Sequence, residues 1–368
     1  MTTPLKVGVI GCGKISDQYF KGCRAYRVLE VVACADLDLA RAQAKAAEYG
    51  VPRALSVDDL LAADDIDIVV NLTIPQAHAE INERALRARK HVYVEKPFAL
   101  NAADGKRQLA LARSQRRLLG SAPDTFLGGG LQTARKLLDD GVIGRPVAAM
   151  AFMVCRGHES WHPSPQFYYQ PGGGPLWDMG PYYLTALVNL LGPIARVSGF
   201  AGKSFAERTI TSQPLAGTRI PVEVATHYTG ALEFANGVAA TMVMSFDVWP
   251  GPSLPRIVVY GEDGTLDVPD PNTFNGEVRL YRPRAKEPET MSATHSLDRG
   301  RGTGVADLAY AALRKGRPHR ASGALAYHVV EAMEALDRAA AGKRVTLRST
   351  CERPAPLPLG LANNELDA

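Results

Sequence analysis

The chain has 368 residues, more than a single hydrophobic core usually supports, so two domains are expected. Hydrophobic residues make up 46% of the chain and charged residues 22%, a mixture that is typical of globular proteins and excludes a disordered or fibrous one. The formal net charge of +4 is too small to indicate a nucleic-acid partner, and no apolar run is long enough to form a membrane helix.

The N-terminal segment MTTPLKVGVIGCG opens on a strand-like apolar run, without the basic head and small-residue cleavage site of a secretory signal. We therefore expect a cytoplasmic protein. The five cysteines are widely spaced and include no CxxC pair, which indicates reduced thiols rather than a zinc ribbon or a disulfide framework.

Residues 1–123 alternate short apolar strands with amphipathic helices, the pattern of a parallel sheet that has helices on both faces. Strands are expected at 7–10, 30–35, 66–72 and 91–94, and helices at 15–26, 39–49 and 77–89. This order predicts a doubly wound Rossmann domain of the α/β class.

Residues 124–345 have a different texture and are predicted to form a second domain with a largely antiparallel sheet. Its clearest signal is the alternation of apolar and polar residues over 222–248, which Asn236 and Gly237 interrupt as a hairpin turn would. Further strands are expected at 147–154, 256–260 and 277–281, and helices at 131–138, 305–314 and 324–340. The basic stretch RKGRPHR at 314–320 is interpreted as a solvated helix end. The proline-rich tail, 346–368, is predicted to be irregular.

The segment VGVIGCGKIS runs from a strand into a helix and predicts a dinucleotide site. Gly11 permits the tight turn, and Gly13 lets the backbone approach a pyrophosphate at the N-terminus of the helix, beside Lys14 and Ile15.

Asp36 ends the second strand about 25 residues after Gly11, where a carboxylate would accept hydrogen bonds from the adenosine ribose, and Leu37 follows it. The carboxylate would repel a 2′-phosphate, so NAD is predicted as the cofactor in preference to NADP. Arg41 is the nearby residue that could complicate this choice.

Two later strand ends are expected to face the same crevice, because ligands of doubly wound sheets bind beyond the carboxyl ends of the strands. One is a TIP segment with a histidine after it, and the other is the sequence EKP. The residues concerned are Thr73, Ile74, Pro75, His78, Glu95, Lys96 and Pro97.

The motifs GCGKIS, the Asp36 strand end, TIPxxH and EKPF occur here in the order and spacing found in the Gfo/Idh/MocA family of dehydrogenases, and the chain resembles this family over nearly its whole length. The resemblance implies a Rossmann domain followed by an α+β domain with an open, mainly antiparallel sheet. It also implies oxidation of a hydroxyl of a sugar, glycoside or cyclitol, with hydride transfer to NAD, and a homodimer or homotetramer formed through the C-terminal sheet. It assigns Lys96 to the catalytic centre.

The segment GGGPLWDMGPYYL carries Asp178 and Tyr182, four residues apart, so both lie on one face if it is helical. Pro181 is tolerated if it lies in the first turn of that helix. The resemblance makes this the second family signature, an aspartate followed four residues later by a histidine, which Tyr182 replaces here. Lys96, Asp178 and Tyr182 are therefore predicted to be both catalytic and substrate-binding.

In the predicted mechanism Tyr182 accepts the proton of the substrate hydroxyl, because the charge of Lys96 stabilises its phenolate. Lys96 also polarises the hydroxyl or shares the proton, and Asp178 orients a sugar hydroxyl or the lysine. The alternative assignment makes Lys96 itself the base.

The stretch HESWH at 158–162 matches the zinc motif HExxH, which requires a helix to bring its two histidines to one face. Gly157 before it and Pro163 after it disfavour that helix, so no metal is predicted. Instead this loop is expected to bind the substrate, through the residues His158, Trp161 and His162.

Two other functions remain open at this point. One is an oxidoreductase that keeps NAD(P) tightly bound and alternates between sugar oxidation and sugar reduction. The other is a non-catalytic NAD-binding sensor. The sequence does not name the sugar, the hydroxyl that reacts or the oligomeric state.

Overall fold

The computed structural model describes residues 3–251, 254–314, 316–339 and 342–367, and the chain folds into two compact units. Unit 1 comprises Met1–Gln132, Thr294–Val330 and Pro354–Ala368, and unit 2 comprises Thr133–Ala293 and Glu331–Arg353. These units differ from the division drawn on the sequence at residues 123 and 345, because two C-terminal segments return to the N-terminal unit.

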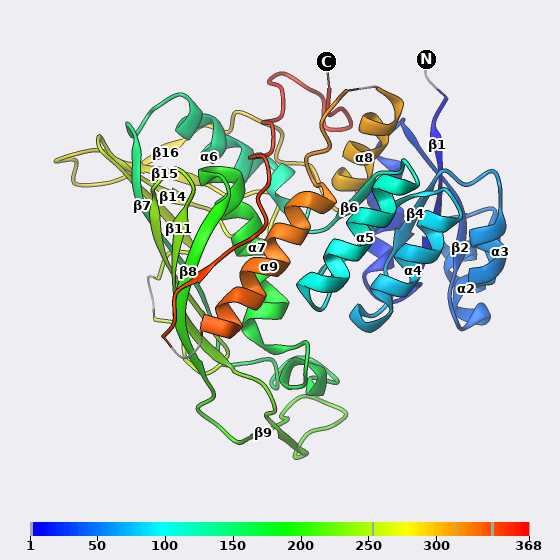
Figure 1. The fold of residues 1–368 in the computed structure, drawn as a ribbon, viewed down its shortest axis with the longest axis horizontal. Helices are drawn as coiled ribbons and strands as arrows, with labels where there is room; N and C mark the ends of the chain where they lie inside the picture. Colours follow the sequence, from blue (N-terminus) through cyan, green and yellow to red (C-terminus); the bar gives the residue numbers. More distant parts are fainter. Residues whose placement is uncertain (1–2, 252–253, 315, 340–341, 368) are drawn as a thin grey trace. The chain divides into compact units, whose positions relative to one another are not determined.

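Unit 1 contains a six-stranded parallel sheet of order β3-β2-β1-β4-β5-β6 (Figure 1). The strands are β1 (Leu5–Ile10), β2 (Leu29–Ala35), β3 (Arg53–Leu55), β4 (Ile68–Asn71), β5 (His91–Val94) and β6 (Leu119–Ser121). The central strands are almost continuously apolar and buried, as expected of a parallel sheet covered on both faces. The predicted Rossmann fold is confirmed.

The helices of unit 1 follow the strands in alternation. They are α1 (Ser16–Arg24), α2 (Leu39–Tyr49), α3 (Val57–Ala62), α4 (Pro75–Arg87), α5 (Ala102–Ser114) and α8 (Thr303–Leu313), with a short 3₁₀ turn η1 (Thr125–Leu127). Helix α4 packs beside α5, and α1 packs beside α8. Helix α8 also lies against β5 and β6, which explains why its segment belongs to this unit.

The basic stretch 314–320 differs from its interpretation as a solvated helix end. The side chains of Arg317 and Arg320 are only 9% and 6% exposed, and both form ion pairs with the fully buried Asp307 at 2.8 and 2.9 Å. The interpretation was wrong because these partners come from the preceding helix, α8.

Unit 2 contains a nine-stranded mixed sheet of order β16-β15-β14-β13-β7-β12-β11-β8-β17. Its strands are β7 (Pro146–Val154), β8 (Ile194–Gly202), β11 (His227–Phe234), β12 (Ala239–Ser245), β13 (Ile257–Gly261), β14 (Thr265–Val268), β15 (Val278–Tyr281), β16 (Glu289–Met291) and β17 (Val345–Thr346). Among the described strand pairs of this sheet, only that of β7 with β12 is parallel, so the mainly antiparallel sheet predicted from the sequence is confirmed. Strands β9 (Glu207–Thr209) and β10 (Arg219–Pro221) form a separate two-stranded sheet.

Helix α7 (Gly174–Leu191) packs against β7, β11 and β12 and buries most of its residues there (Figure 1). Pro175 stands in its first turn, whereas Pro181 lies in its interior, so the condition under which Pro181 would be tolerated in the first turn is not the one that applies. An interior proline has no N–H to donate to the carbonyl four residues earlier, and here the buried apolar surface of the helix outweighs that loss.

Two further helices, α6 (Gly129–Asp139) and α9 (Gly323–Ala339), each contribute residues to both units, and η2 (Gln166–Tyr169) is a 3₁₀ turn of unit 2. After β17 the described chain has no further helix or strand, as predicted for the tail. Within the described ranges, no helix combines the length and the apolar composition that crossing a bilayer requires.

Candidate active site

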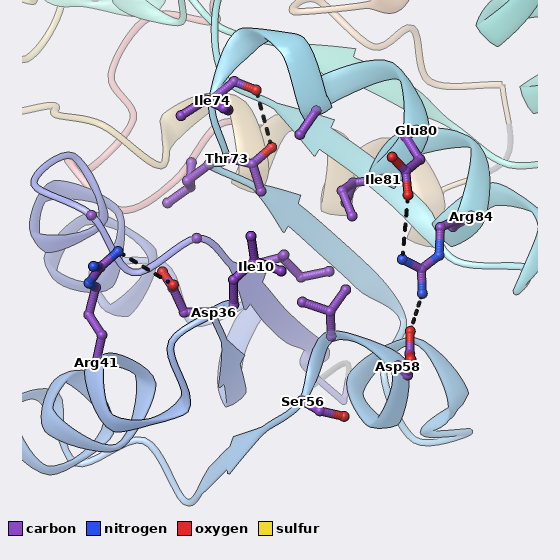
Figure 2. A pocket seen from close by; sticks show the side chains of 16 residues that line it. Ile10, Asp36, Arg41, Ser56, Asp58, Thr73, Ile74, Glu80, Ile81 and Arg84 are labelled. Carbon is purple, nitrogen blue, oxygen red and sulfur yellow. Dashed lines mark hydrogen bonds and ion pairs between the residues drawn. The ribbon is translucent and has the colours of Figure 1, made fainter.

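A pocket of about 610 Å³ opens in unit 1 at the carboxyl ends of β1, β2 and β4 (Figure 2). Six of the residues predicted to bind the cofactor line it: Gly11, Gly13, Asp36, Leu37, Thr73 and Ile74. The other predicted residues, Lys14, Ile15, Pro75, His78, Glu95, Lys96 and Pro97, are not among its lining residues.

Gly11 and Gly13 are suited to the turn for different physical reasons. Gly11 has a φ of +99°, and a Cβ there would lie 2.6 Å from the carbonyl oxygen of Leu72, so only glycine fits. A Cβ on Gly13 would meet nothing within 4 Å. The space beside Gly13, at the start of α1, is therefore open, and because glycine has no side chain a pyrophosphate could approach the backbone there.

Asp36 is fixed in place by backbone donors. Its carboxylate accepts hydrogen bonds from the N–H of Cys12 at 2.8 Å and of Asp38 at 3.0 Å. Arg41 reaches the same carboxylate at 3.5 Å, and its side chain is 53% exposed (Figure 2). The pocket thus offers a preorganised ribose acceptor with a cation beside it, an arrangement that fits NAD.

The opposite wall of the pocket carries an ion-pair network that the sequence analysis did not identify. Arg84 of α4 pairs with Asp58 of α3, and it lies 3.8 Å from Glu80 one helical turn earlier (Figure 2). Arg84 and Asp58 are 26 residues apart in sequence, and no local motif signals their pairing.

His78 lies beneath the crevice rather than in it. It is 1% exposed, with Nδ1 2.8 Å from the carbonyl oxygen of Pro97 and Nε2 3.0 Å from that of Thr73. Burial lowers the pKa of His78, and the neutral ring donates its single N–H to one of these two carbonyls. The residue therefore connects the TIP and EKP segments to each other.

Glu95 holds the backbone at the start of the EKP segment. It is 7% exposed and accepts hydrogen bonds from the hydroxyl of Tyr19 and from the N–H of Lys96, both at 2.8 Å. Arg301 stands 3.8 Å from the same carboxylate. The backbone of Lys96, shortly after the end of β5, is thus held in place by the buried side chain of Glu95.

In unit 2, α7 supplies both predicted catalytic residues of this unit, so the helical spacing expected for Asp178 and Tyr182 is confirmed. Tyr182 is 5% exposed. The carboxylate of Asp178 is 17% exposed and lies 3.6 Å from Nε2 of His158.

The HESWH stretch forms a turn and not a helix, as predicted from its flanking residues. His158 and Trp161 line a cavity of about 840 Å³ in unit 2, whereas His162 is not among its lining residues. The ring of His162 instead contacts the rings of Trp161 and Tyr168. Among the described residues, no group of three or more His, Cys, Asp or Glu side chains is arranged to hold a metal ion.

The cavity of unit 2 also contains residues that the sequence analysis did not select. Its charged side chains are Arg156, Glu159, Glu207, Arg208, Arg256 and Asp270. Aromatic side chains accompany them, among them Phe205 and Trp249. A polar cavity with aromatic walls can bind a sugar, because hydroxyl groups need hydrogen-bond partners and the C–H faces pack on rings.

Comparison with known proteins gives two family matches. Residues 5–122 match the model described as "Oxidoreductase family, NAD-binding Rossmann fold", and residues 131–267 match the GFO/IDH/MocA C-terminal domain.

Curated relatives are similar over part of their length. A dTDP-3,4-didehydro-2,6-dideoxy-alpha-D-glucose 3-reductase of Saccharopolyspora spinosa is 34% identical over 198 residues, which cover 53% of this chain and 58% of the relative. An inositol 2-dehydrogenase of Salmonella typhimurium is 32% identical over 147 residues, which cover 39% of this chain and 44% of the relative. The matched stretch thus spans about half the length of these curated relatives.

Solved structures share the fold at lower identity. An NAD-binding oxidoreductase of Klebsiella pneumoniae has a TM-score of 0.80 and 21% identity, with coverage of 93% of this chain and 99% of that one. A levoglucosan dehydrogenase in complex with NADH and L-sorbose has a TM-score of 0.78 and 20% identity, with coverage of 94% and 99%. Since the two family matches together span most of both units, the chain belongs to the Gfo/Idh/MocA family of oxidoreductases with an NAD-binding Rossmann fold.

Proposed function

We propose that this protein is an NAD-dependent dehydrogenase that oxidises a hydroxyl of a sugar, glycoside or cyclitol by hydride transfer to nicotinamide. The observation that carries the proposal is a nucleotide pocket built around Asp36 in unit 1, in a chain whose unit 2 holds a polar cavity with aromatic walls. Relatives named as an inositol dehydrogenase and as sugar reductases support this substrate class.

The protein's own residues hold the cofactor and handle the proton, and NAD would supply the hydride acceptor. Gly11 and Gly13 leave room for the pyrophosphate, and Asp36 accepts the hydrogen bonds of the ribose. We assign proton acceptance to Tyr182, stabilisation of its phenolate to Lys96, and orientation of the sugar to Asp178. Lys96 as the base itself is the competing assignment.

Steady-state turnover tests this function. Purified protein is incubated with NAD and a panel of aldoses, glycosides and cyclitols, and formation of reduced nicotinamide is followed by absorbance. We expect turnover with at least one member. Nicotinamide that copurifies with the protein and needs a second sugar for release would instead support the enzyme that alternates oxidation and reduction. Absence of turnover throughout the panel, with NAD bound, would favour the sensor.

The carboxylate of Asp36 should determine coenzyme choice. Replacing it by alanine removes a charge that opposes a 2′-phosphate. It also removes one of the two carboxylates beside Arg41, so that Arg41, with the exposed Asp38 still 3.7 Å away, can contact such a phosphate. We expect kcat/KM with NADP, relative to that with NAD, to rise about 10-fold or more, as expected for one unfavourable charge contact in a partly buried site. Glu48→Gln, which removes an exposed carboxylate from α2, is the control and should change kcat/KM with neither NAD nor NADP. A wild-type preference for NADP would contradict the assignment.

We also propose that the protein is a homodimer or homotetramer formed through the sheet of unit 2. Met150, Thr241 and Ala231 stand side by side on neighbouring strands and are exposed. An exposed face of small and apolar residues is a typical oligomer interface. Light scattering coupled to size exclusion should give a multiple of the 39.6 kDa chain mass, and Thr241→Asp should reduce it. A monomeric wild-type mass at micromolar concentration would contradict the proposal.

A further inference from the structure

The arginines of the unit 2 cavity differ in the number of carboxylates that pair with them. Arg208 is 6% exposed and is neutralised twice, by Glu159 at 3.1 Å and by Asp247 at 2.5 Å. Arg256 lies 3.4 Å from Asp270. Arg156 has no carboxylate partner among the residues that the structure describes.

Arg156 is nevertheless held in a defined position. Its guanidinium stacks over the ring of Phe205, with Cζ 4.4 Å from the ring centroid, and donates a hydrogen bond to the carbonyl oxygen of Asp247 at 3.3 Å. Arg208 donates to the carbonyl oxygen of Arg156 at 3.3 Å, which fixes its backbone as well. A guanidinium stacked on an aromatic ring keeps donor N–H groups available for the oxygens of a carboxylate or a phosphate.

The carboxylates of the cavity wall do not compete for this cation. Glu159 pairs with Arg208, Glu207 pairs with Arg219, and Asp270 pairs with Arg256. Arg156 is thus the arginine of this wall that forms no ion pair with a carboxylate of the described chain. Each neighbouring carboxylate pairs with another arginine, and Glu159 and Asp247 share the same one.

A second observation marks the same cavity as a ligand site. Nε2 of His158 is buried and has no hydrogen-bond partner in the part of the chain that the structure describes, and His158 as a whole is 9% exposed. Its nearest acidic oxygen, on Asp178, is 3.6 Å away, beyond a normal hydrogen bond. A buried nitrogen without a partner costs stability, so its retention beside a cavity indicates that a bound ligand completes the site, directly or by moving Asp178.

We propose that the sugar substrate carries an anionic group, a carboxylate or a phosphate, and that Arg156 binds this group in the cavity of unit 2. The inference rests on the proposed dehydrogenase function and narrows its substrate class to sugar acids or sugar phosphates. Arg156 then acts as a specificity-determining residue, since a neutral sugar leaves its guanidinium without a counter-charge.

Binding and turnover are measured separately to test this inference. Glucuronate, a hexose monophosphate and glucose serve as probes, in calorimetric titrations of the NAD-loaded protein and in turnover assays. We expect one of the two anions to bind at least about 10-fold more tightly than glucose, as a charge-assisted bidentate contact would give. The first two probes distinguish a carboxylate substrate from a phosphate substrate. Added salt should weaken binding of the anion more than that of glucose.

Variants then assign the preference to Arg156. Arg156→Gln should weaken binding of the anion about 10–100-fold and raise its KM with kcat nearly unchanged, while the affinity for glucose stays the same. Arg156→Lys keeps the charge but loses the planar fork, so it should give an intermediate loss and shows that the cavity still folds. Arg279→Gln removes an exposed arginine from β15 and should have no effect.

The outcomes separate the two proposals. Equal affinity for glucose and for both anions, or unchanged anion binding in Arg156→Gln, overturns the inference and leaves the dehydrogenase standing. Anion binding that depends on Arg156 without any NAD reduction supports the anion site and counts against the proposed function.

Discussion

Replacing Lys96 by alanine is expected to lower turnover about 10²–10⁴-fold, the usual contribution of general acid–base catalysis, and to leave the affinity for NAD nearly unchanged. The backbone of Lys96 should keep its place in the variant, because Glu95 accepts its N–H at 2.8 Å and is itself held by Tyr19. Lys96 is also absent from the wall of the nucleotide pocket, so its side chain is not expected to carry the cofactor's affinity.

Tyr182→Phe separates the two candidate bases. If Tyr182 accepts the proton with the help of Lys96, the phenylalanine variant should lose a factor comparable to that of Lys96→Ala. The double variant should then lose far less than the product of the two single losses, because residues that act as one unit are not additive. The experiment is a double-mutant cycle on kcat, with NAD titration of each variant as the folding control.

Tyr26→Phe is a matched control for this cycle. Tyr26 is 2% exposed, its hydroxyl forms a hydrogen bond of 2.7 Å with that of Thr303, and it lines neither the nucleotide pocket nor the cavity of unit 2. Its replacement should cost some stability without a loss of turnover on the scale of the Tyr182 variant. Near-wild-type turnover of Tyr182→Phe, combined with a large loss in Lys96→Ala, would remove the tyrosine from the mechanism and leave Lys96 as the base.

The fold could be predicted where the sequence pattern is set by burial alone. The helix at 39–49 and the strand at 91–94 were predicted with the bounds that the structure gives, and the hairpin at Asn236-Gly237 joins β11 and β12 as expected. The short strands β9, β10 and β16 were missed because three residues carry too little periodicity. β9 and β10 pair with each other and β16 pairs with β15, so each of these strands depends on its partner segment and not on a pattern of its own.

The site was predictable where backbone geometry imposes a residue type. It was not predictable where contacts form between side chains that are distant in sequence. Gly11 and Asp36 have positions in a motif, and both line the pocket. Arg156 and Arg208 are ordinary residues in the sequence, and their different roles depend on Glu159 and Asp247, which only the folded chain brings to Arg208. The number of carboxylates that pair with each arginine could not be obtained from the sequence spacing.

Asp307 illustrates the same limit for stability, and its replacement by asparagine should be among the most destabilising single changes in unit 1. Its side chain is fully buried and accepts hydrogen bonds from Arg317 at 2.8 Å and from Arg320 at 2.9 Å, and from the N–H of Arg320 at 2.6 Å. Asparagine removes the carboxylate that the buried guanidinium groups of Arg317 and Arg320 share. The carboxylate of Asp367 is then the one that still pairs with them. Breaking a buried ion pair from one side typically costs about 3–5 kcal/mol of the free energy of unfolding.

Urea unfolding of wild type and Asp307→Asn near neutral pH measures this loss, with Asp65→Asn as the control. Asp65 is 42% exposed and pairs with Arg53 at 2.8 Å in the same unit, and an exposed pair of this kind contributes less than about 1 kcal/mol. Similar losses in the two variants would contradict the role given to Asp307.

Acid should act on this cluster in two separate ranges. Burial lowers the pKa of His319, 3.8 Å from Asp307, to about 4 from its ordinary 6.5, so between pH 6.5 and 4 the unfolded chain takes up a proton that the folded chain rejects. By this linkage His319 should cost about 2 kcal/mol of the free energy of unfolding at pH 5, in wild type and in Asp307→Asn alike. For Asp307, burial opposes ionisation but the surrounding positive charges outweigh it and lower its pKa below 3.8. The stabilisation of the folded chain by ionised Asp307 is therefore complete above pH 3.8 and is lost only as the pH falls further. The loss of stability below pH 3.8 should thus be missing from Asp307→Asn, whereas the loss due to His319 should remain.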